Sequence, residues 1–303
     1  MRIIIELLFT NSCNRNCGYC VAKSKDASSF GKAQFTNASG DYKLESGIIN
    51  TVQLKKWLLV QRKRFDDIQL VISGGEPTLV RHWIEFLDWC FDNGFKNPIV
   101  YTNGINLRDL LDCQHNPKDL VKIILTHHLD IIICSPEGKE ESTANRVEFL
   151  KDLEMNFMVK LLTNGKDMRE FGDSLKCNYV VEGIRQLYSE NAEEKARQLS
   201  SEIAPLSGDS PYRWRWNGYG DLIDRKRTQW KESILLTVDP TGNVFNCHLF
   251  DVPVGNIYKL SKNMTGLQTA WCPYWDTYNQ ETMECKETRC EIQHYVNLMD
   301  TLS

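Results

Sequence analysis

The sequence predicts an α/β protein in which helices cover a mostly parallel sheet. Short apolar runs alternate with stretches of helical spacing through the first two thirds of the chain. An order of strand, helix, strand predicts parallel strands joined by crossover helices. Six such units can be traced, fewer than the eight of a closed barrel, so a partial barrel and an open sheet fit the pattern equally well. In both architectures ligands gather at the carboxyl ends of the strands.

Each predicted strand is a short run rich in Ile, Val, Leu and Tyr, bounded by Gly, Pro, Asn or Asp. The six runs cover residues 3–9, 68–73, 98–101, 130–134, 157–162 and 179–184. Between and after them, apolar residues recur at helical spacing, which predicts helices. These helices cover residues 52–64, 83–93, 120–126, 146–155 and 190–203.

The pattern changes near Pro205, which predicts a barrel-like part over residues 1–205 and a second, α+β module over 206–303. Residues 207–211 have the composition of a linker. A hairpin follows, with strands at 234–238 and 243–250 around the turn Asp-Pro-Thr-Gly at 239–242. The last helix-like stretch covers about residues 291–302.

Composition excludes several classes of protein. The chain has 303 residues, 42% of them hydrophobic, and a net charge of -4, so neither disorder nor a basic nucleic-acid-binding surface is expected. The apolar start, residues 1–9, is too short for a membrane span or a signal peptide, which predicts a cytoplasmic protein. Thiols stay reduced there, so the 11 cysteines indicate metal or iron-sulfur ligation, or buried thiols, rather than disulfides.

Three cysteines lie close together just after the first predicted strand. Cys13, Cys17 and Cys20 are separated by three and two residues. Three thiolates on one loop can hold three irons of a 4Fe-4S cluster and leave the fourth iron open to a ligand. A zinc knuckle or a set of redox thiols is the alternative, but a structural zinc site takes four protein ligands and no fourth closes this loop.

This loop resembles the signature of the radical S-adenosylmethionine (SAM) enzymes, in which an aromatic residue precedes the third cysteine, as Tyr19 does. The run after the second predicted strand is similar to the family's SAM-binding glycine motif, and its members are Gly74, Gly75, Glu76 and Pro77. A Cβ there would block close approach of the backbone to the ligand. Thr102, Asn103 and Ser135 are similar to positions that contact the SAM ribose and carboxylate. Ordinary turns are the alternative interpretation of these short motifs.

The resemblance implies a partial (β/α)6 radical SAM barrel and a definite chemistry. SAM would chelate the open iron, an electron from the cluster would enter the sulfonium, and the resulting 5'-deoxyadenosyl radical would abstract a hydrogen atom. The protein would orient the substrate and exclude water and oxygen. A low-potential electron donor such as flavodoxin or ferredoxin would be a partner.

The tail carries four more cysteines, Cys247, Cys272, Cys285 and Cys290. Four thiolates fully ligate a 4Fe-4S cluster or a zinc ion. The hairpin with Cys247, followed by Gly-Asn-Ile at 255–257, resembles the SPASM and twitch modules that hold auxiliary clusters in many radical SAM enzymes. The dense cysteine run of a full SPASM domain is absent. The resemblance therefore implies one auxiliary cluster in a twitch-like fold, with zinc or a cluster with an open iron as the alternatives.

The remaining four cysteines are expected to be packing residues. Cys90 lies on an apolar helix face and Cys134 in a predicted strand. Cys113 and Cys177 are the substitutes if one tail ligand is assigned wrongly.

Aromatic and basic residues interleave in the run Arg213, Trp214, Arg215 and Trp216. If this run is extended, the tryptophans share one face and the arginines the other. Guanidinium groups suit a carboxylate or phosphate, and rings suit stacking on a base, which predicts a small polar or nucleotide-linked substrate. The alternative is an edge strand with solvated arginines. His127 and His128 are expected in a helix-end turn with structural roles, and His248 is undecided.

Three rival functions remain. The first is a maturase that modifies ribosomal peptides. The second is an activating enzyme that passes its radical to a glycyl-radical partner protein. The third is a cluster-bearing sensor without turnover.

Overall fold

The computed structural model describes residues 2–14, 47–128, 142–163, 168–183, 214–217, 233–245 and 255–258. The strands within these ranges form one sheet, in the order β10-β9-β8-β1-β2-β3-β4-β5-β6-β7. All pairs from β8 through β1 to β7 are parallel. The β8–β9 and β9–β10 pairs are antiparallel. The predicted parallel α/β architecture is therefore confirmed.

The first six strands run in sequence order across the sheet, each beside the next. They are β1 (Arg2–Thr10), β2 (Asp67–Gly74), β3 (Ile99–Thr102), β4 (Lys122–His128), β5 (Asn156–Thr163) and β6 (Tyr179–Gly183). The outer strands are β7 (Trp214–Asn217), β8 (Ser233–Val238), β9 (Asn243–Phe245) and β10 (Gly255–Asn256).

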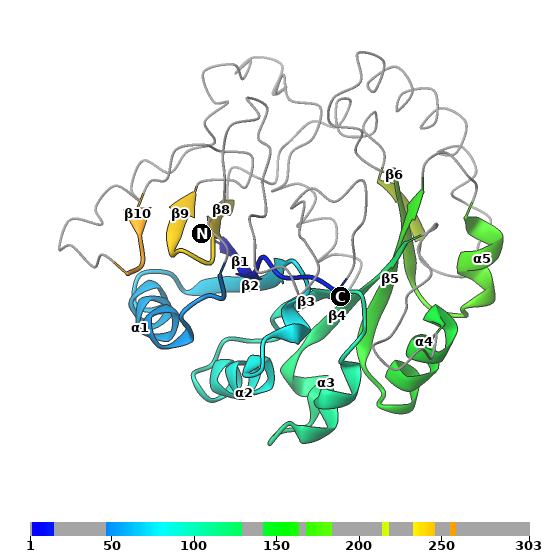
Figure 1. Cartoon of the computed structure of the whole chain (residues 1–303), viewed down its shortest axis with the longest axis horizontal. Helices are drawn as coiled ribbons and strands as arrows, with labels where there is room; N and C mark the ends of the chain where they lie inside the picture. The colour runs from blue at the N-terminus through cyan, green and yellow to red at the C-terminus, as the bar shows by residue number, and fades with distance from the viewer. Residues whose placement is uncertain are drawn as a thin grey trace, which may run out of the picture.

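Helices lie along one side of this curved sheet (Figure 1). They are α1 (Thr51–Arg62), α2 (Trp83–Asp92), α3 (Pro117–Leu120), α4 (Thr143–Asp152) and α5 (Arg169–Ser174). Two 3-10 helices, η1 (Pro77–Leu79) and η2 (Leu107–Asp112), follow β2 and β3. The predicted helices at 52–64, 83–93 and 146–155 correspond to α1, α2 and α4. Within the described ranges no helix has the length and apolar character needed to cross a bilayer.

The predicted helix at 120–126 is wrong, because this run forms β4. A short helix, α3, ends at Leu120, and the fourth strand starts at Lys122 rather than at residue 130. Ile123 and Ile124 are both fully buried, one on each face of the sheet. A strand buried on both faces reads as a continuous apolar run and lacks the alternation that identifies half-buried strands. The predicted strand at 130–134 lies outside the described residues.

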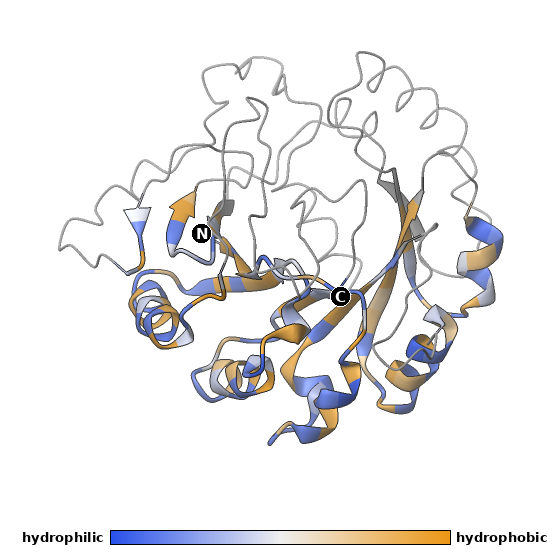
Figure 2. Cartoon of the chain, in the orientation of Figure 1, coloured by the Kyte–Doolittle hydropathy of each residue, from blue (hydrophilic) through white to orange (hydrophobic). Residues whose placement is uncertain are grey.

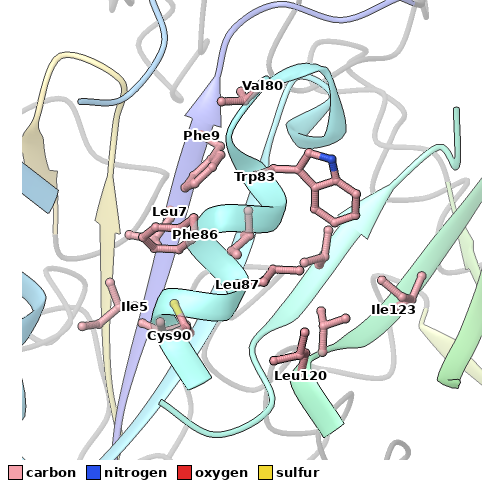
Figure 3. Packing of buried hydrophobic residues seen from close by; sticks show 14 of the residues in the cluster. Ile5, Leu7, Phe9, Val80, Trp83, Phe86, Leu87, Cys90, Leu120 and Ile123 are labelled. Carbon is pink, nitrogen blue, oxygen red and sulfur yellow. The ribbon is translucent and has the colours of Figure 1, made fainter. Parts of the chain in front are cut away.

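The main core lies between the sheet and its helices (Figure 3). Alternate residues of β1 point to this side, and Ile5, Leu7 and Phe9 pack against α2. The rings of Phe9 and Phe86 have centroids 4.9 Å apart. Figure 2 shows that the strands are mainly apolar while the helices carry both kinds of residue, as expected for helices with one buried face. The strand positions are thus fixed by this core.

The opposite face of β1 carries a buried carboxylate. Glu6 is 5% exposed and alternates with the core residues of the same strand. It accepts hydrogen bonds from the Ser73 hydroxyl (2.8 Å) and the Thr237 hydroxyl (3.2 Å). Glu6 therefore joins β1 to both of its neighbours, β2 and β8.

The predicted hairpin is confirmed as β8 and β9, and its first strand continues the sheet beside β1. The Asp239 carboxylate accepts from the Asn243 main-chain N–H (2.9 Å) and the Thr241 hydroxyl (2.8 Å), which closes the turn. The predicted linker at 207–211 and the helices at 190–203 and 291–302 lie outside the described residues. The division of the chain at residue 206 stays a prediction.

Candidate functional site

Three chain segments meet at the carboxyl edge of the sheet, where parallel strands place their ligands. They follow β1, β2 and β3 and cover residues 10–14, 74–77 and 102–104. The Gly75 main-chain N–H donates to the Thr10 carbonyl oxygen (2.6 Å), and that of Glu76 donates to the Ser12 carbonyl oxygen (2.8 Å). The structure thus brings together seven residues that the sequence singled out, namely Cys13, Gly74, Gly75, Glu76, Pro77, Thr102 and Asn103.

The two glycines are required by the segment that leads to Cys13. Gly74 has φ +117°, a conformation that side chains with a Cβ rarely adopt, and a Cβ there would lie 2.5 Å from the Thr10 carbonyl oxygen. A Cβ on Gly75 would overlap the main chain of Ser12. The sequence predicted that a ligand approaches these glycines closely. Among the described residues, it is the main chain of Thr10 and Ser12 that does so. The glycine motif therefore positions the start of the cysteine loop.

The carboxylate of Glu76 ties the segment after β2 to the segment after β3. It is 1% exposed. One oxygen accepts from the Thr78 main-chain N–H (3.1 Å), the Thr78 hydroxyl (2.7 Å) and the Thr102 hydroxyl (2.7 Å). The other accepts from the Asn103 main-chain N–H (2.7 Å). Burial raises the pKa of this carboxyl above its ordinary value, and the four hydrogen bonds oppose that shift.

Asn103 reaches from this second segment to the cysteine loop. Its side-chain amide nitrogen lies 2.8 Å from the Asn14 side-chain oxygen and 4.0 Å from the Cys13 sulfur. Its main-chain carbonyl accepts from the guanidinium of Arg146 on α4 (2.8 Å). Arg146 is 3% exposed, and sequence reasoning missed it, because an arginine on an amphipathic helix is ordinarily solvated.

The surroundings of Cys13 fit a thiolate ligand of an iron-sulfur cluster. The thiol is half-buried, and its sulfur lies 4.0 Å from the side-chain nitrogen of Asn103 and 4.0 Å from the side-chain oxygen of Asn14. The N–H donor of Asn103 is the contact that suits a ligating sulfur, because a hydrogen bond to sulfur stabilises its negative charge. The other proposed ligands, Cys17, Cys20, Cys247, Cys272, Cys285 and Cys290, lie outside the described residues, as do Tyr19 and Ser135. Within the described ranges alone, no three side chains of metal-ligating type form a group.

The run with the interleaved tryptophans is extended, as predicted. Trp214–Asn217 form β7, which pairs with β6 in parallel and lies at the end of the described sheet. Arg213 lies outside the described residues. The position of the run in the sheet is known, while its substrate contacts stay a prediction.

The histidine pair lies in β4 rather than in a helix-end turn, so that prediction was wrong about the element. The His127 Nδ1 lies 2.7 Å from the Thr143 hydroxyl oxygen, and its ring is 4.6 Å from that of Phe171. These contacts support the structural role that was expected for His127. His248 lies outside the described residues.

Comparison with known proteins gives matches among solved structures. No protein-family model matches the chain, and no curated protein is significantly similar to it. The structure superposes on SuiB of Streptococcus suis bound to SAM with a TM-score of 0.60 at 12% identity, covering 99% of this chain and 72% of SuiB. Nearly the same match, with a TM-score of 0.60 and 13% identity, covers 99% of this chain and 73% of SuiB bound to its precursor peptide SuiA.

A further match covers both chains almost completely. It is anSMEcpe with bound SAM and the Cp18Cys peptide, with a TM-score of 0.62 at 10% identity over 100% of this chain and 99% of that one. The chain therefore has the fold of SAM-binding radical enzymes. The fold indicated by the cysteine motif is confirmed.

Proposed function

We propose that the protein is a radical SAM enzyme, which cleaves SAM reductively and abstracts a hydrogen atom from its substrate. One observation carries the proposal. Cys13, the first cysteine of the C-x3-C-x2-C motif, lies at the carboxyl edge of β1, where the glycine motif and Asn103 contact its loop. Cys13 thus lies in the structural context that this chemistry requires, within a sheet of the matching fold.

Cys13, Cys17 and Cys20 would hold the cluster, and residues from the neighbouring strand ends would surround SAM. When bound, the cluster and SAM supply one-electron cleavage chemistry and hydrogen abstraction. Tyr19, Gly74, Gly75, Pro77, Thr102, Asn103 and Ser135 are the proposed SAM-side residues. Because the Glu76 carboxylate is occupied by Thr78, Thr102 and Asn103, its own contribution is to fix the two segments.

One auxiliary 4Fe-4S cluster is proposed for the tail, held by Cys247, Cys272, Cys285 and Cys290. The confirmed hairpin supports this, because Cys247 comes two residues after the end of β9 in the sequence. Alanine at Cys13, Cys17 and Cys20 together should leave about one 4Fe-4S cluster per chain in iron and sulfide analysis. If this variant contains no iron and sulfide, the proposal of an auxiliary cluster is wrong. If it contains zinc instead, the four tail cysteines form a zinc site.

A small polar or nucleotide-linked molecule is the proposed substrate. Its support is the Arg-Trp run Arg213, Trp214, Arg215 and Trp216, of which Trp214, Arg215 and Trp216 lie in β7, at the end of the described sheet. A peptide is the second candidate, favoured by the two fold neighbours that were solved with peptides bound. Incubation of the active enzyme with nucleotide and peptide pools, followed by mass spectrometry, should show which pool increases SAM cleavage.

A cytoplasmic location and a low-potential electron donor belong to the same proposal. Among the described residues, Cys90, Cys113 and Cys177 form no disulfide, which agrees with a reducing compartment.

The central test is SAM turnover. The protein should be reconstituted with iron and sulfide without oxygen, reduced, and given SAM. We expect 5'-deoxyadenosine as a product even without substrate, and its loss in the Cys13→Ala variant. A reconstituted protein that holds the cluster but leaves SAM intact would instead be a sensor or scaffold. Co-purification with a glycyl-radical protein would favour the activating-enzyme function.

A further inference from the structure

We infer that the Asn103 side chain donates a hydrogen bond to the sulfur of Cys13 and thereby raises the reduction potential of the cluster, with Arg146 as the residue that positions it. The inference rests on the proposed function, because it takes Cys13 as a cluster ligand. It deepens that function by assigning to two residues the control of the electron transfer that precedes SAM cleavage.

The orientation of the Asn103 amide is fixed by its hydrogen bonds. Its side-chain oxygen accepts from the Ile105 main-chain N–H (3.2 Å), so the NH2 group must point the other way. One of its two N–H groups donates to the Asn14 side-chain oxygen at 2.8 Å. The same nitrogen lies 4.0 Å from the Cys13 sulfur, which it faces as a hydrogen-bond donor.

The main chain of Asn103 is held from both sides by buried charged groups. The carboxylate of Glu76 accepts from its N–H at 2.7 Å, and the guanidinium of Arg146 donates to its carbonyl at 2.8 Å. Both side chains are almost fully buried, at 1% and 3% exposure. Hydrogen bonds to charged groups are stronger than those between neutral groups, so Asn103 has little freedom to move from the sulfur.

The chain makes room for Arg146 at one particular residue. Gly104 has φ +84°, and a Cβ there would lie 2.7 Å from the Cδ of Arg146 and 2.7 Å from a methyl carbon of Leu125. A buried guanidinium is costly unless it is hydrogen-bonded. The hydrogen bond from Arg146 to the Asn103 carbonyl oxygen helps to offset this cost and holds Asn103 in place beside the cysteine loop.

An N–H donor favours the reduced state of the cluster. Reduction adds negative charge that is shared by the ligating sulfurs, and a hydrogen bond to sulfur stabilises that charge. Removal of the donor should therefore make the reduction potential more negative. Electron entry would then need a stronger reductant.

The test is a redox titration followed by electron paramagnetic resonance on the whole reconstituted protein. The signal to follow is the one that disappears in Cys13→Ala, which separates it from any tail cluster. Asn103→Leu has a similar size without the donor and should shift the midpoint to more negative potential. Asn103→Asp replaces the N–H donor by a carboxylate oxygen and should shift the midpoint potential further in the same direction. This variant tests the inference if Asn103→Leu does not fold.

Arg146 is tested by a graded pair of variants with a control on the same helix. Arg146→Met should shift the midpoint in the same direction, and Arg146→Lys should restore part of it, because lysine can still donate to the Asn103 carbonyl. Glu148→Gln removes an exposed charge from α4 and should leave the midpoint unchanged.

Two results are distinguishable. A midpoint in Asn103→Leu or Asn103→Asp equal to that of the wild type, with a Cys13-dependent cluster and 5'-deoxyadenosine formation intact, overturns this inference alone. Absence of any Cys13-dependent cluster overturns the proposed function and the inference with it.

Discussion

At the scale of single residues, a methyl group at residue 75 should impair cluster assembly even in protein that still folds. A Cβ in Gly75→Ala would overlap the main chain of Ser12, so the segment leading to Cys13 must move. Overpacking of this kind typically costs about 1–3 kcal/mol of unfolding free energy. We expect a lower Tm and, in the protein that remains folded, a marked loss of iron at the Cys13 cluster, measured by iron analysis.

The matched control is Gly47→Ala. A Cβ on Gly47 would have the Cβ of Pro240 as its nearest neighbour, at 3.8 Å, which is ordinary van der Waals contact. This variant should keep both the Tm and the iron content of the wild type. An unchanged iron content in Gly75→Ala would show that the glycine motif does not position the cysteine loop.

Glu76→Gln should reveal how the buried carboxylate contributes to stability. A glutamine has one acceptor oxygen, so its NH2 group would face donors that the carboxylate now satisfies, such as the Asn103 N–H. An unsatisfied buried donor costs about 1–3 kcal/mol. Urea unfolding near neutral pH should show a loss of that size.

The pH dependence of the same variant follows from the pKa of Glu76, which burial raises above its ordinary value of 4.5. Above pH 4.5 the unfolded chain releases this proton while the folded protein still holds it. The part of the stability that comes from retaining this proton is therefore complete below pH 4.5 and is lost as the pH rises through the folded-state pKa, while the hydrogen bonds of the carboxylate remain. The difference in unfolding free energy between wild type and Glu76→Gln should fall over that window. Subtraction is needed because burial also raises the pKa of Asp239.

At the scale of elements, three cysteines are packing residues of helices and their ends. Cys90 lies on the face of α2 that packs on the sheet and is fully buried. Burial raises the pKa of the Cys113 thiol to about 12 and that of Cys177 to about 11, so neither is a ready thiolate. Their position against the core supports the packing interpretation and speaks against substitution for a tail ligand.

Alanine at Cys90, Cys113 or Cys177 should leave the iron and sulfide content of the protein unchanged. Cys90→Ala should lower the unfolding free energy by about 1–2 kcal/mol, because it leaves a small cavity under α2. Loss of one cluster equivalent in Cys113→Ala or Cys177→Ala would instead identify that residue as a ligand.

At the scale of the whole molecule, Tyr258 connects the turn between β8 and β9 to the start of α1. Its hydroxyl accepts from the Asn50 main-chain N–H (2.8 Å) and donates to the Pro240 carbonyl oxygen (3.0 Å). Gly242, with φ +81°, lies against the Tyr258 ring, where a Cβ would come within 2.6 Å. Together with the β1–β8 pairing, this contact joins residues far apart in sequence.

Tyr258→Phe should weaken this junction without altering the barrel. Loss of the two hydrogen bonds should cost about 1–2 kcal/mol of unfolding free energy. Hydrogen exchange should become faster at Asn50 and in the turn at 239–242, while amides of the central strand β4 keep wild-type protection. Uniform loss of protection through β4 would contradict a local role for Tyr258.

Sequence patterns sufficed where local chemistry specifies the element. Strands β1, β2, β3, β5 and β6 and helices α1, α2 and α4 were predicted close to their observed bounds, because each has a clear period or clear flanking residues. The cysteine spacing and the glycine motif likewise indicated the proposed site, and the structure places Cys13, the first of the three cysteines, close to that motif. Covalent spacing on one loop is a property of the sequence alone.

Tertiary structure decided the rest. β4 is buried on both faces, so its apolar run carries no period, and only its pairing with β3 and β5 identifies it as a strand. That Gly74 and Gly75 accommodate Thr10 and Ser12, and that Arg146 holds Asn103 beside Cys13, depends on contacts between residues tens of positions apart. Such contacts are set by how the strands pack, which no local pattern records. The sequence by itself indicated the class of chemistry that we propose, and the packed sheet determined which residues surround Cys13.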